Sequence, residues 1–510
     1  MSNEVQAIRF KQWLPEWDNF VFDQAQHRRK PDEYVLLFSM PAVQLRALSG
    51  VYRRQRDQTG GVGLQRLHDP KRSATIRDFV RFGHPYSSLQ ASTRSPDTEH
   101  LKKPGWLPTA IVVNVLTASD KRRGRRVAPN DLVKVATPTE ATATLTLPYA
   151  DRLDRWVPQD LEPFEVIDGQ HRLWAFEEAL ADGTLPGDFE LPVVAFSGLD
   201  IGWQAYLFWS INVSPKRINP SHAFDLFPLL RSEKWLETFS ELRIYREARA
   251  QELTELLFTH AESPWRQRIN MLGESVKTAP SGAGVTQAGW VRAVLSSFLA
   301  PGGKGRSARG LFCADITPTT GPLSWARPQQ AAFLILLWRK IHEAVRSRKH
   351  QWVEQLLRPE GQEALVDDAE PAFSGTRTML NQEQGVRGVL AIGNDLFFEL
   401  AHRESGLFEW PTSVAAGGVT LLEDVTVALL ELQKMPLAAW IIEIAQDMSS
   451  FDWRSADAPN LDEQTRLIKR AFRGSGGYVA LREQLLNHIV RGGGRVSQIA
   501  GELAAQKGIT

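Results

Sequence analysis

Residues 164–181 read FEVIDGQHRLWAFEEALA, and this stretch decides the fold of the N-terminal half. Phe164–Asp168 is an apolar run of strand length that ends in an acid. Gly169 then permits a sharp turn or the close approach of a ligand. Over 172–181, apolar side chains recur at helical spacing, at Leu173, Phe176 and Leu180. The stretch therefore predicts a strand, a tight turn and a helix.

The alternation of strands and helices continues on both sides of this stretch. Short apolar or β-branched runs predict further strands at 34–39, 110–116, 132–136, 143–147 and 191–196. Helical spacing predicts short helices that begin near Pro41 and at Ser73, the second ending before Gly83. Since strand, turn, helix and strand follow one another from 164 to 196, we expect a βαβ-like unit.

The pattern changes at about residue 221, beyond which long amphipathic stretches dominate, at 237–260, 328–357, 382–402 and 420–448. We therefore expect an α/β N-terminal domain followed by a mainly α-helical C-terminal part. The expected boundaries are an N-terminal extension over 1–30, the α/β domain over 31–230, and a helical region over 231–510 that forms one or two subdomains.

Composition narrows the functional classes. The 510 residues are 43% hydrophobic and 23% charged, with a formal net charge of +1, so any contact with DNA has to depend on a local basic patch. The single cysteine, Cys313, excludes an intramolecular disulfide and fits a reducing compartment. Neither a secretory signal pattern nor an apolar run of membrane-spanning length is present, so we expect a cytoplasmic protein without membrane contact.

The turn at 168–172, Asp-Gly-Gln-His-Arg, has the chemistry of an anion site. The first N–H groups of a helix have no partners inside the helix, and its dipole favours an anion there. Arg172 adds a fork of donors suited to phosphate oxygens. Asp168 is placed to hold Mg²⁺ or orient water, and His171 to donate to a phosphate or move a proton. The alternative is that Asp168 caps the helix and Arg172 pairs with an acid.

The string VIDGQHRLWAF at 166–176 resembles the signature of the DGQHR-domain family, which includes the DndB proteins of DNA phosphorothioation systems. The resemblance covers roughly residues 30–230. It extends to the strand at 191–196, to the segment at 208–212 with Lys216, and to the upstream stretches 77–80 and 107–114.

The same turn is similar to those of ParB-type CTP-binding domains, Gly-Glu-Arg-Arg, and of sulfiredoxins, Gly-Cys-His-Arg. The resemblance implies a ParB/sulfiredoxin-like fold that binds nucleotide phosphates at this turn. Gln170 stands where sulfiredoxins have their cysteine, so the nucleophile for sulfinic acid reduction is missing.

By this resemblance, Asp168 and His171 are expected to be catalytic, with Asp168 also the metal ligand. Phosphate binding is expected at Gly169, Gln170, Arg172, Asn212, Lys216 and Arg77. For the last three residues, a helix-capping or solvated surface role is the alternative.

The segment SDKRRGRRVAPN at 119–130 carries five basic residues around Gly124, between two expected strands. We interpret it as a loop or hairpin tip that contacts the DNA backbone without reading sequence, through Lys121, Arg122, Arg123, Arg125 and Arg126. The alternative is a solvated run of charge.

These observations together favour a protein of a bacterial DNA-modification or antiphage defence system. We expect it to bind a nucleoside triphosphate, ATP above others, with Mg²⁺, to hydrolyse it, and to associate with DNA and with other subunits of the system. A homo-oligomer is compatible with the sequence. The alternative is a non-enzymatic, DndB-like transcriptional regulator of a DNA-modification operon. A scaffold that recruits partners through its helical part is a third hypothesis.

Overall fold

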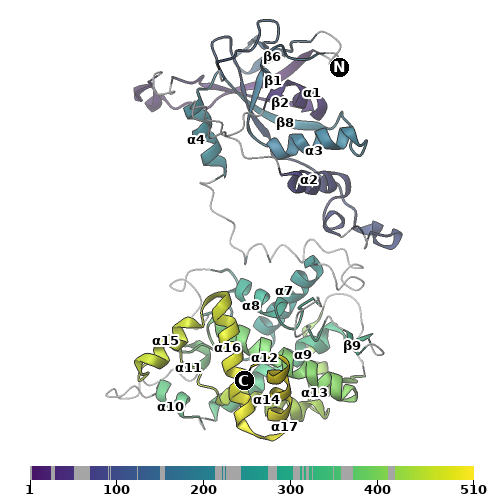
Figure 1. Cartoon of the computed structure of the whole chain (residues 1–510), viewed down its shortest axis with the longest axis vertical. Helices are drawn as coiled ribbons and strands as arrows, with labels where there is room; N and C mark the ends of the chain where they lie inside the picture. Colours follow the sequence, from purple (N-terminus) through teal and green to yellow (C-terminus); the bar gives the residue numbers. More distant parts are fainter. Residues whose placement is uncertain are drawn as a thin grey trace. The chain divides into compact units, whose positions relative to one another are not determined.

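The computed structural model (Figure 1) divides into two compact units, residues 1–217 and 218–510. It describes residues 3–23, 29–50, 69–149 without 90, 92, 93 and 123, 156–212, 221, 224, 243–273, 284–301, 310–312, 315–317, 321–323, 325–347, 350–357, 371–411 and 420–509. Two expected features, Lys216 and Arg123, lie outside the described residues.

A mixed, curled sheet of eight strands forms the centre of the N-terminal unit, in the order β3-β7-β4-β8-β2-β1-β6-β5. The strands are β1 (Glu4–Lys11), β2 (Tyr34–Pro41), β3 (Ser49–Gly50), β4 (Ile111–Val115), β5 (Lys134–Ala136), β6 (Thr142–Thr146), β7 (Phe164–Asp168) and β8 (Glu190–Ser197). The strands expected from apolar runs are therefore present, and β7 has the expected bounds.

The unit from β7 to β8 differs from the expected βαβ arrangement. Strand β4 lies between the two, pairing antiparallel with β7 and parallel with β8. Strands β7 and β8 therefore run in opposite directions and do not touch as neighbours. The order of the elements along the chain does not predict this pairing. Strand β4 ends about 50 residues before β7 begins, and only the tertiary structure places it between β7 and β8.

Strand β1 is the second departure. Residues 1–30 were expected to form an extension outside the domain, whereas β1 pairs antiparallel with both β2 and β6. The burial of β1 is weak, with Ala7 its only fully buried residue. The sequence EVQAIRFK contains no apolar run of strand length, so it does not predict a strand here. Backbone pairing with β2 and β6 holds β1 in the sheet.

Among the described residues, four helices accompany the sheet: α1 (Ala42–Leu48) and α3 (Gln170–Ala181) pack on one face, α4 (Ile201–Asn212) packs against β7 on the other, and α2 (Pro70–Phe82) packs against α3. The 3-10 turns lie at Pro15–Asn19, Tyr86–Ser88 and Pro96–Leu101. Side chains alternate along β7, so Val166 packs in the core with Phe176 of α3, while Glu165 points to the other face and contacts Gln204 of α4. Strand β7 thus supplies residues to both faces.

The C-terminal unit is mainly helical, as expected. Its helices are α7 (Arg243–Thr259), α8 (Gln287–Leu295), α9 (Arg327–Arg346), α10 (Gln351–Leu357), α11 (Pro371–Ser374), α12 (Glu383–Arg403), α13 (Leu422–Leu432), α14 (Leu437–Ser450), α15 (Glu463–Ala471), α16 (Gly474–Gly492) and α17 (Gly494–Gln506), with a 3-10 turn at Ser405–Phe408. A short hairpin joins β9 (Asp315–Thr317) to β10 (Gly321–Pro322).

Helix α9 runs through the core of this unit, and nearly all of its residues from Pro328 to Trp338 are buried. Its Trp338 meets Trp265 and Trp290 with ring centroids 5.1 and 5.5 Å apart. Most of the stretch 420–448 forms two helices, since Pro436 interrupts it between α13 and α14. Within the described residues no single helix has the length and apolarity to cross a membrane; the pair α13 and α14 meets that test only jointly, with a 91° bend.

Candidate functional site

The turn between β7 and α3 has the geometry that the sequence predicts. Gly169 caps α3 in the left-handed region, at φ 97°. A Cβ at this position would lie 2.6 Å from Cδ1 of Ile111 and 2.9 Å from Nη2 of Arg172. The backbone conformation therefore favours glycine, and a side chain here would also displace the ends of the Ile111 and Arg172 side chains. The chain can therefore reverse at this one residue, so that α3 begins at Gln170, two residues after β7 ends at Asp168.

Asp168 organises the side chains around the turn. Its Oδ2 accepts a hydrogen bond from Nη2 of Arg172 at 3.2 Å, and its Oδ1 accepts one from Nδ2 of Asn212 at 3.3 Å. Arg172 also donates through Nη1 to Oγ1 of Thr109, at 2.7 Å, and to the Thr109 carbonyl. Asn212 donates in addition to the carbonyl of Phe208 at 3.1 Å. Asp168 thus fixes one residue of α3 and one of α4.

A partly open cavity of about 80 Å³ lies at this turn, between β7, α2, α3 and α4. It is lined by Arg72, Ile76, Asp168, Gly169, Gln170, His171, Arg172, Phe208 and Asn212. Sites that enclose a whole drug-sized ligand measure roughly 300–1,000 Å³. The cavity is therefore of a size for one phosphoryl group, with the rest of any nucleotide outside it.

The charge around the cavity is positive. Two guanidinium groups, of Arg72 and Arg172, face one carboxylate, of Asp168. Burial lowers the pKa of Arg172 from its ordinary value, Asp168 counteracts this, and the charge of Arg72 lowers the pKa further. Arg172 stays protonated at neutral pH nevertheless, because an arginine pKa starts far above it. An anion in the cavity would relieve the repulsion between the two arginines.

Two further residues of the turn, Gln170 and His171, are almost fully buried, with 5% and 8% of their surface exposed. The Oε1 atom of Gln170 has no hydrogen-bond partner among the described residues. The His171 ring packs edge-on against Trp174, with centroids 5.5 Å apart. A buried polar atom without a partner costs about 1–3 kcal/mol, so Gln170 is a group that a ligand could satisfy.

The structure brings together most of the residues expected to bind phosphate. All five residues of the turn and Asn212 line the one cavity. Arg77 does not: its Nη1 forms an ion pair with Oδ2 of Asp182, 3.1 Å away at the far end of α3. Arg77 thus forms a surface ion pair, as in the alternative left open by the sequence, and phosphate binding at this residue stays a prediction.

Sequence analysis did not single out Arg72, which lines the cavity from α2 together with Ile76. The two residues are four apart in the sequence and so share one helix face. Helical spacing predicts that Ile76 points inward. The same spacing places Arg72, and not Arg77, on the face of α2 that Ile76 occupies. Phe208 of α4 completes the apolar part of the wall.

The donor set does not by itself make a Mg²⁺ site. Asp168 is the one acid among the lining residues, and both of its oxygens already accept hydrogen bonds. Nowhere in the described part of the chain do three or more His, Cys, Asp or Glu residues gather in a metal-binding group. The protein offers one carboxylate at most, so a Mg²⁺ ion here would need nucleotide phosphates as its other ligands.

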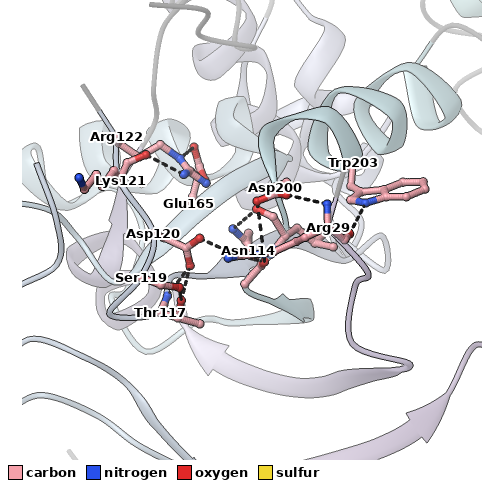
Figure 2. A network of polar contacts seen from close by, with 12 residues as sticks. Arg29, Asn114, Thr117, Ser119, Asp120, Lys121, Arg122, Glu165, Asp200 and Trp203 are labelled. Atoms are coloured by element: carbon pink, nitrogen blue, oxygen red, sulfur yellow. Dashed lines mark hydrogen bonds and ion pairs between the residues drawn. The ribbon is translucent and has the colours of Figure 1, made fainter. Parts of the chain in front are cut away.

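The basic segment around Gly124 forms a tight hairpin, in which Arg122 and Arg125 exchange backbone hydrogen bonds of 2.9 and 3.0 Å. Arg122, expected to contact DNA, instead turns inward to the buried Glu165 of β7 (Figure 2). Its Nε and Nη2 donate to that carboxylate at 2.6–2.9 Å, and Gln204 donates to it at 2.8 Å. Arg122 is therefore an anchor of the hairpin, and its expected contact with DNA stays a prediction.

A second anchor holds the base of the hairpin (Figure 2). The buried Asp120 accepts hydrogen bonds from the backbone and hydroxyl of Thr117 and forms an ion pair of 2.6 Å with Arg29. Arg29 is in turn bound to Asp200, 3.2 Å away. Among the described residues of the hairpin, three cations are exposed to solvent, and we call them the basic tip: Lys121, Arg125 and Arg126.

Comparisons with protein-family models, with curated proteins and with solved structures find no match for this chain.

Proposed function

We propose that the N-terminal unit binds the phosphoryl end of a nucleoside triphosphate at the turn between β7 and α3. The observation that carries the proposal is the cavity at residues 168–172. It combines a helix N-terminus, two guanidinium groups and a phosphate-sized volume. Backbone N–H groups at a helix N-terminus together with arginine form a common phosphate site in proteins.

Hydrolysis of the nucleotide is the second part of the proposal. Water would add to the terminal phosphorus as the bond to the leaving phosphate breaks, and the negative charge that develops would be stabilised by the helix N-terminus and the arginines. His171 lines the cavity and is the residue able to accept and pass on the proton. Asp168 would hold Arg172 and Asn212 in position and orient the water. Mg²⁺, entering with the phosphates, would neutralise part of their charge.

The wider biological setting rests on the resemblance to the DGQHR-domain family. The signature occupies the strand, turn and helix that its chemistry requires, in an α/β unit. We propose on this basis a ParB/sulfiredoxin-like domain in a bacterial DNA-modification or antiphage defence protein, with the basic tip contacting the DNA backbone. ATP is the first nucleotide to test.

Turnover of ATP, GTP and CTP by the wild type and by Asp168→Ala tests the catalytic part. We expect turnover of one nucleotide by the wild type and at least a tenfold loss, about 1.4 kcal/mol in barrier, in the variant. Circular dichroism has to show that the variant folds, because Asp168→Ala leaves Arg172 without its acid; Asp168→Asn is the milder second variant. Equal turnover by wild type and both variants would remove the claim of catalysis.

A second candidate function, that of a non-enzymatic regulator that binds DNA, is favoured by one observation. The three cations of the basic tip are exposed and lie on a hairpin that two anchors hold in place. Such a surface suits sequence-neutral contact with phosphates. Operator-selective gel shifts in the absence of nucleotide, together with no hydrolysis, would favour the regulator over the nucleotidase.

A further inference from the structure

The cavity holds two arginines whose situations differ. The side chain of Arg172 is 14% exposed, and its guanidinium donates to Asp168 and to both oxygens of Thr109. Three acceptors already define its orientation, and reaching an anion with its full fork would require breaking these bonds. Arg172 is therefore suited to shaping the wall of the cavity and adding charge to it, and less suited to bidentate capture of a ligand.

Arg72 lies at the same cavity from the opposite element, α2. Its side chain is exposed, and in the described part of the chain no hydrogen bond or ion pair engages its guanidinium. The next arginine along the helix, Arg77, is by contrast held by Asp182. Arg72 is thus the cation whose fork is available to a ligand, and its helix is fixed by Asp69, which caps the first turn.

The inner wall of the cavity provides a second, independent indication of a ligand. Gln170 is 95% buried, lines the cavity, and has a side-chain oxygen without a hydrogen-bond partner among the described residues. The NH₂ group of the same amide forms no hydrogen bond with a described residue, and it is the donor that Gln170 offers to a phosphate oxygen. The cavity therefore has a donor at its floor and another at its rim.

The volume selects among phosphate compounds. A partly open cavity of about 80 Å³, lined by residues that include Gly169 and Gln170, fits a phosphoryl group with one substituent that leaves through the opening. An internal phosphodiester of a nucleic acid has two substituents, and both would have to leave through the same opening. The geometry favours a phosphate monoester or the terminal phosphate of a nucleotide over a phosphodiester.

We propose that Arg72 and Gln170 form the recognition pair for a terminal phosphoryl group, and that Arg172 is a positioning residue. This rests on the proposed nucleotide binding at the turn and adds the residues that capture the phosphate and the class of phosphate captured. Internal phosphates of DNA bind elsewhere, outside the cavity.

The test is calorimetric titration of the full chain with ATP, inorganic phosphate and a dinucleoside monophosphate that has only a phosphodiester. The variants are Arg72→Ala, Arg72→Lys and, as a matched control from the same helix, Arg77→Ala. We expect the wild type to bind ATP and phosphate but not the phosphodiester. Arg72→Ala should weaken ATP binding at least about tenfold, as loss of a charge-assisted bidentate contact does, and Arg72→Lys should recover part of it.

Arg77→Ala should bind as tightly as the wild type. If the wild type binds ATP and Arg72→Ala binds it equally well, the recognition role of Arg72 is overturned while nucleotide binding stands. If the phosphodiester binds as tightly as inorganic phosphate, and loses affinity in Arg72→Ala, the terminal-phosphate assignment is overturned. If the wild type binds none of the three compounds, the proposed function itself fails.

Discussion

Replacement of Arg122 by alanine tests whether this residue anchors the hairpin. Its side chain and that of Glu165 are 13% and 5% exposed, and three contacts of 2.6–2.9 Å join them. Removing one member of a buried pair costs about 3–5 kcal/mol, since the other charge stays in the interior. Gln204 still donates to Glu165, and Arg122 is not fully buried, so we expect the lower limit, about 3 kcal/mol.

The assay is urea unfolding of the full chain, followed by hydrogen exchange in peptides from β7 and α3, which separates the N-terminal unit from the C-terminal one. Arg125→Ala, on the same hairpin but exposed, is the control and should change stability by less than about 0.5 kcal/mol. Glu165→Gln combined with Arg122→Ala should restore part of the loss, because the unpaired charge is gone. Equal stability of Arg122→Ala and Arg125→Ala would refute the anchoring role.

Three further predictions concern the turn, the basic tip and the C-terminal unit. Gly169→Ala should destabilise the N-terminal unit by about 2 kcal/mol. A residue with a Cβ in the left-handed region costs about 1–2 kcal/mol, and the new methyl group would also contact Ile111. An unchanged thermal unfolding curve would contradict this prediction. Alanine at all three positions of the basic tip should weaken DNA binding. The slope of the logarithm of the DNA association constant against the logarithm of the salt concentration should fall in magnitude by up to about 3. An unaltered slope would show that DNA binds elsewhere on the protein. Burial, with Glu443 adding to it, raises the pKa of Asp447 to about 6. The folded state then keeps a proton that the unfolded state releases between about pH 4 and pH 6, so stability falls as the pH rises through that window. Asp447→Asn should remove this fall and stabilise the protein at about pH 7 by about 1 kcal/mol, allowing for partial exposure, and denaturation curves that show the same pH slope in both proteins would disprove it.

The local pattern of the sequence is sufficient to predict the turn at 168–172 and most of the strands and helices around it. The apolar run of β7, the glycine after it and the helical spacing of Leu173 and Phe176 are each determined within a few residues, and the structure has them where expected. The same holds for the end of α2 at Gly83, whose φ of 63° suits glycine. These features depend on neighbours in the chain, which a sequence displays directly.

The remaining features depend on contacts between distant residues. Nothing near Arg122 in the sequence indicates that Glu165, 43 residues later, would bind it, so five cations of one segment were expected to act together. Contacts between distant segments likewise determine that β4 lies between β7 and β8 and that β1 pairs with β6. Helical spacing places Arg72 on the same face of α2 as Ile76, but the ion pair that engages Arg77 comes from Asp182 on a distant segment and is not visible in the sequence.

The central claim is that a phosphoryl group binds at the turn between β7 and α3. The most direct measurement is a crystal structure of the full chain with a non-hydrolysable ATP analogue and Mg²⁺. We expect the terminal phosphate in the cavity at Gly169 and Gln170, within hydrogen-bond distance of Arg72. Density for the nucleotide at any other place, with this cavity holding only water, would contradict it.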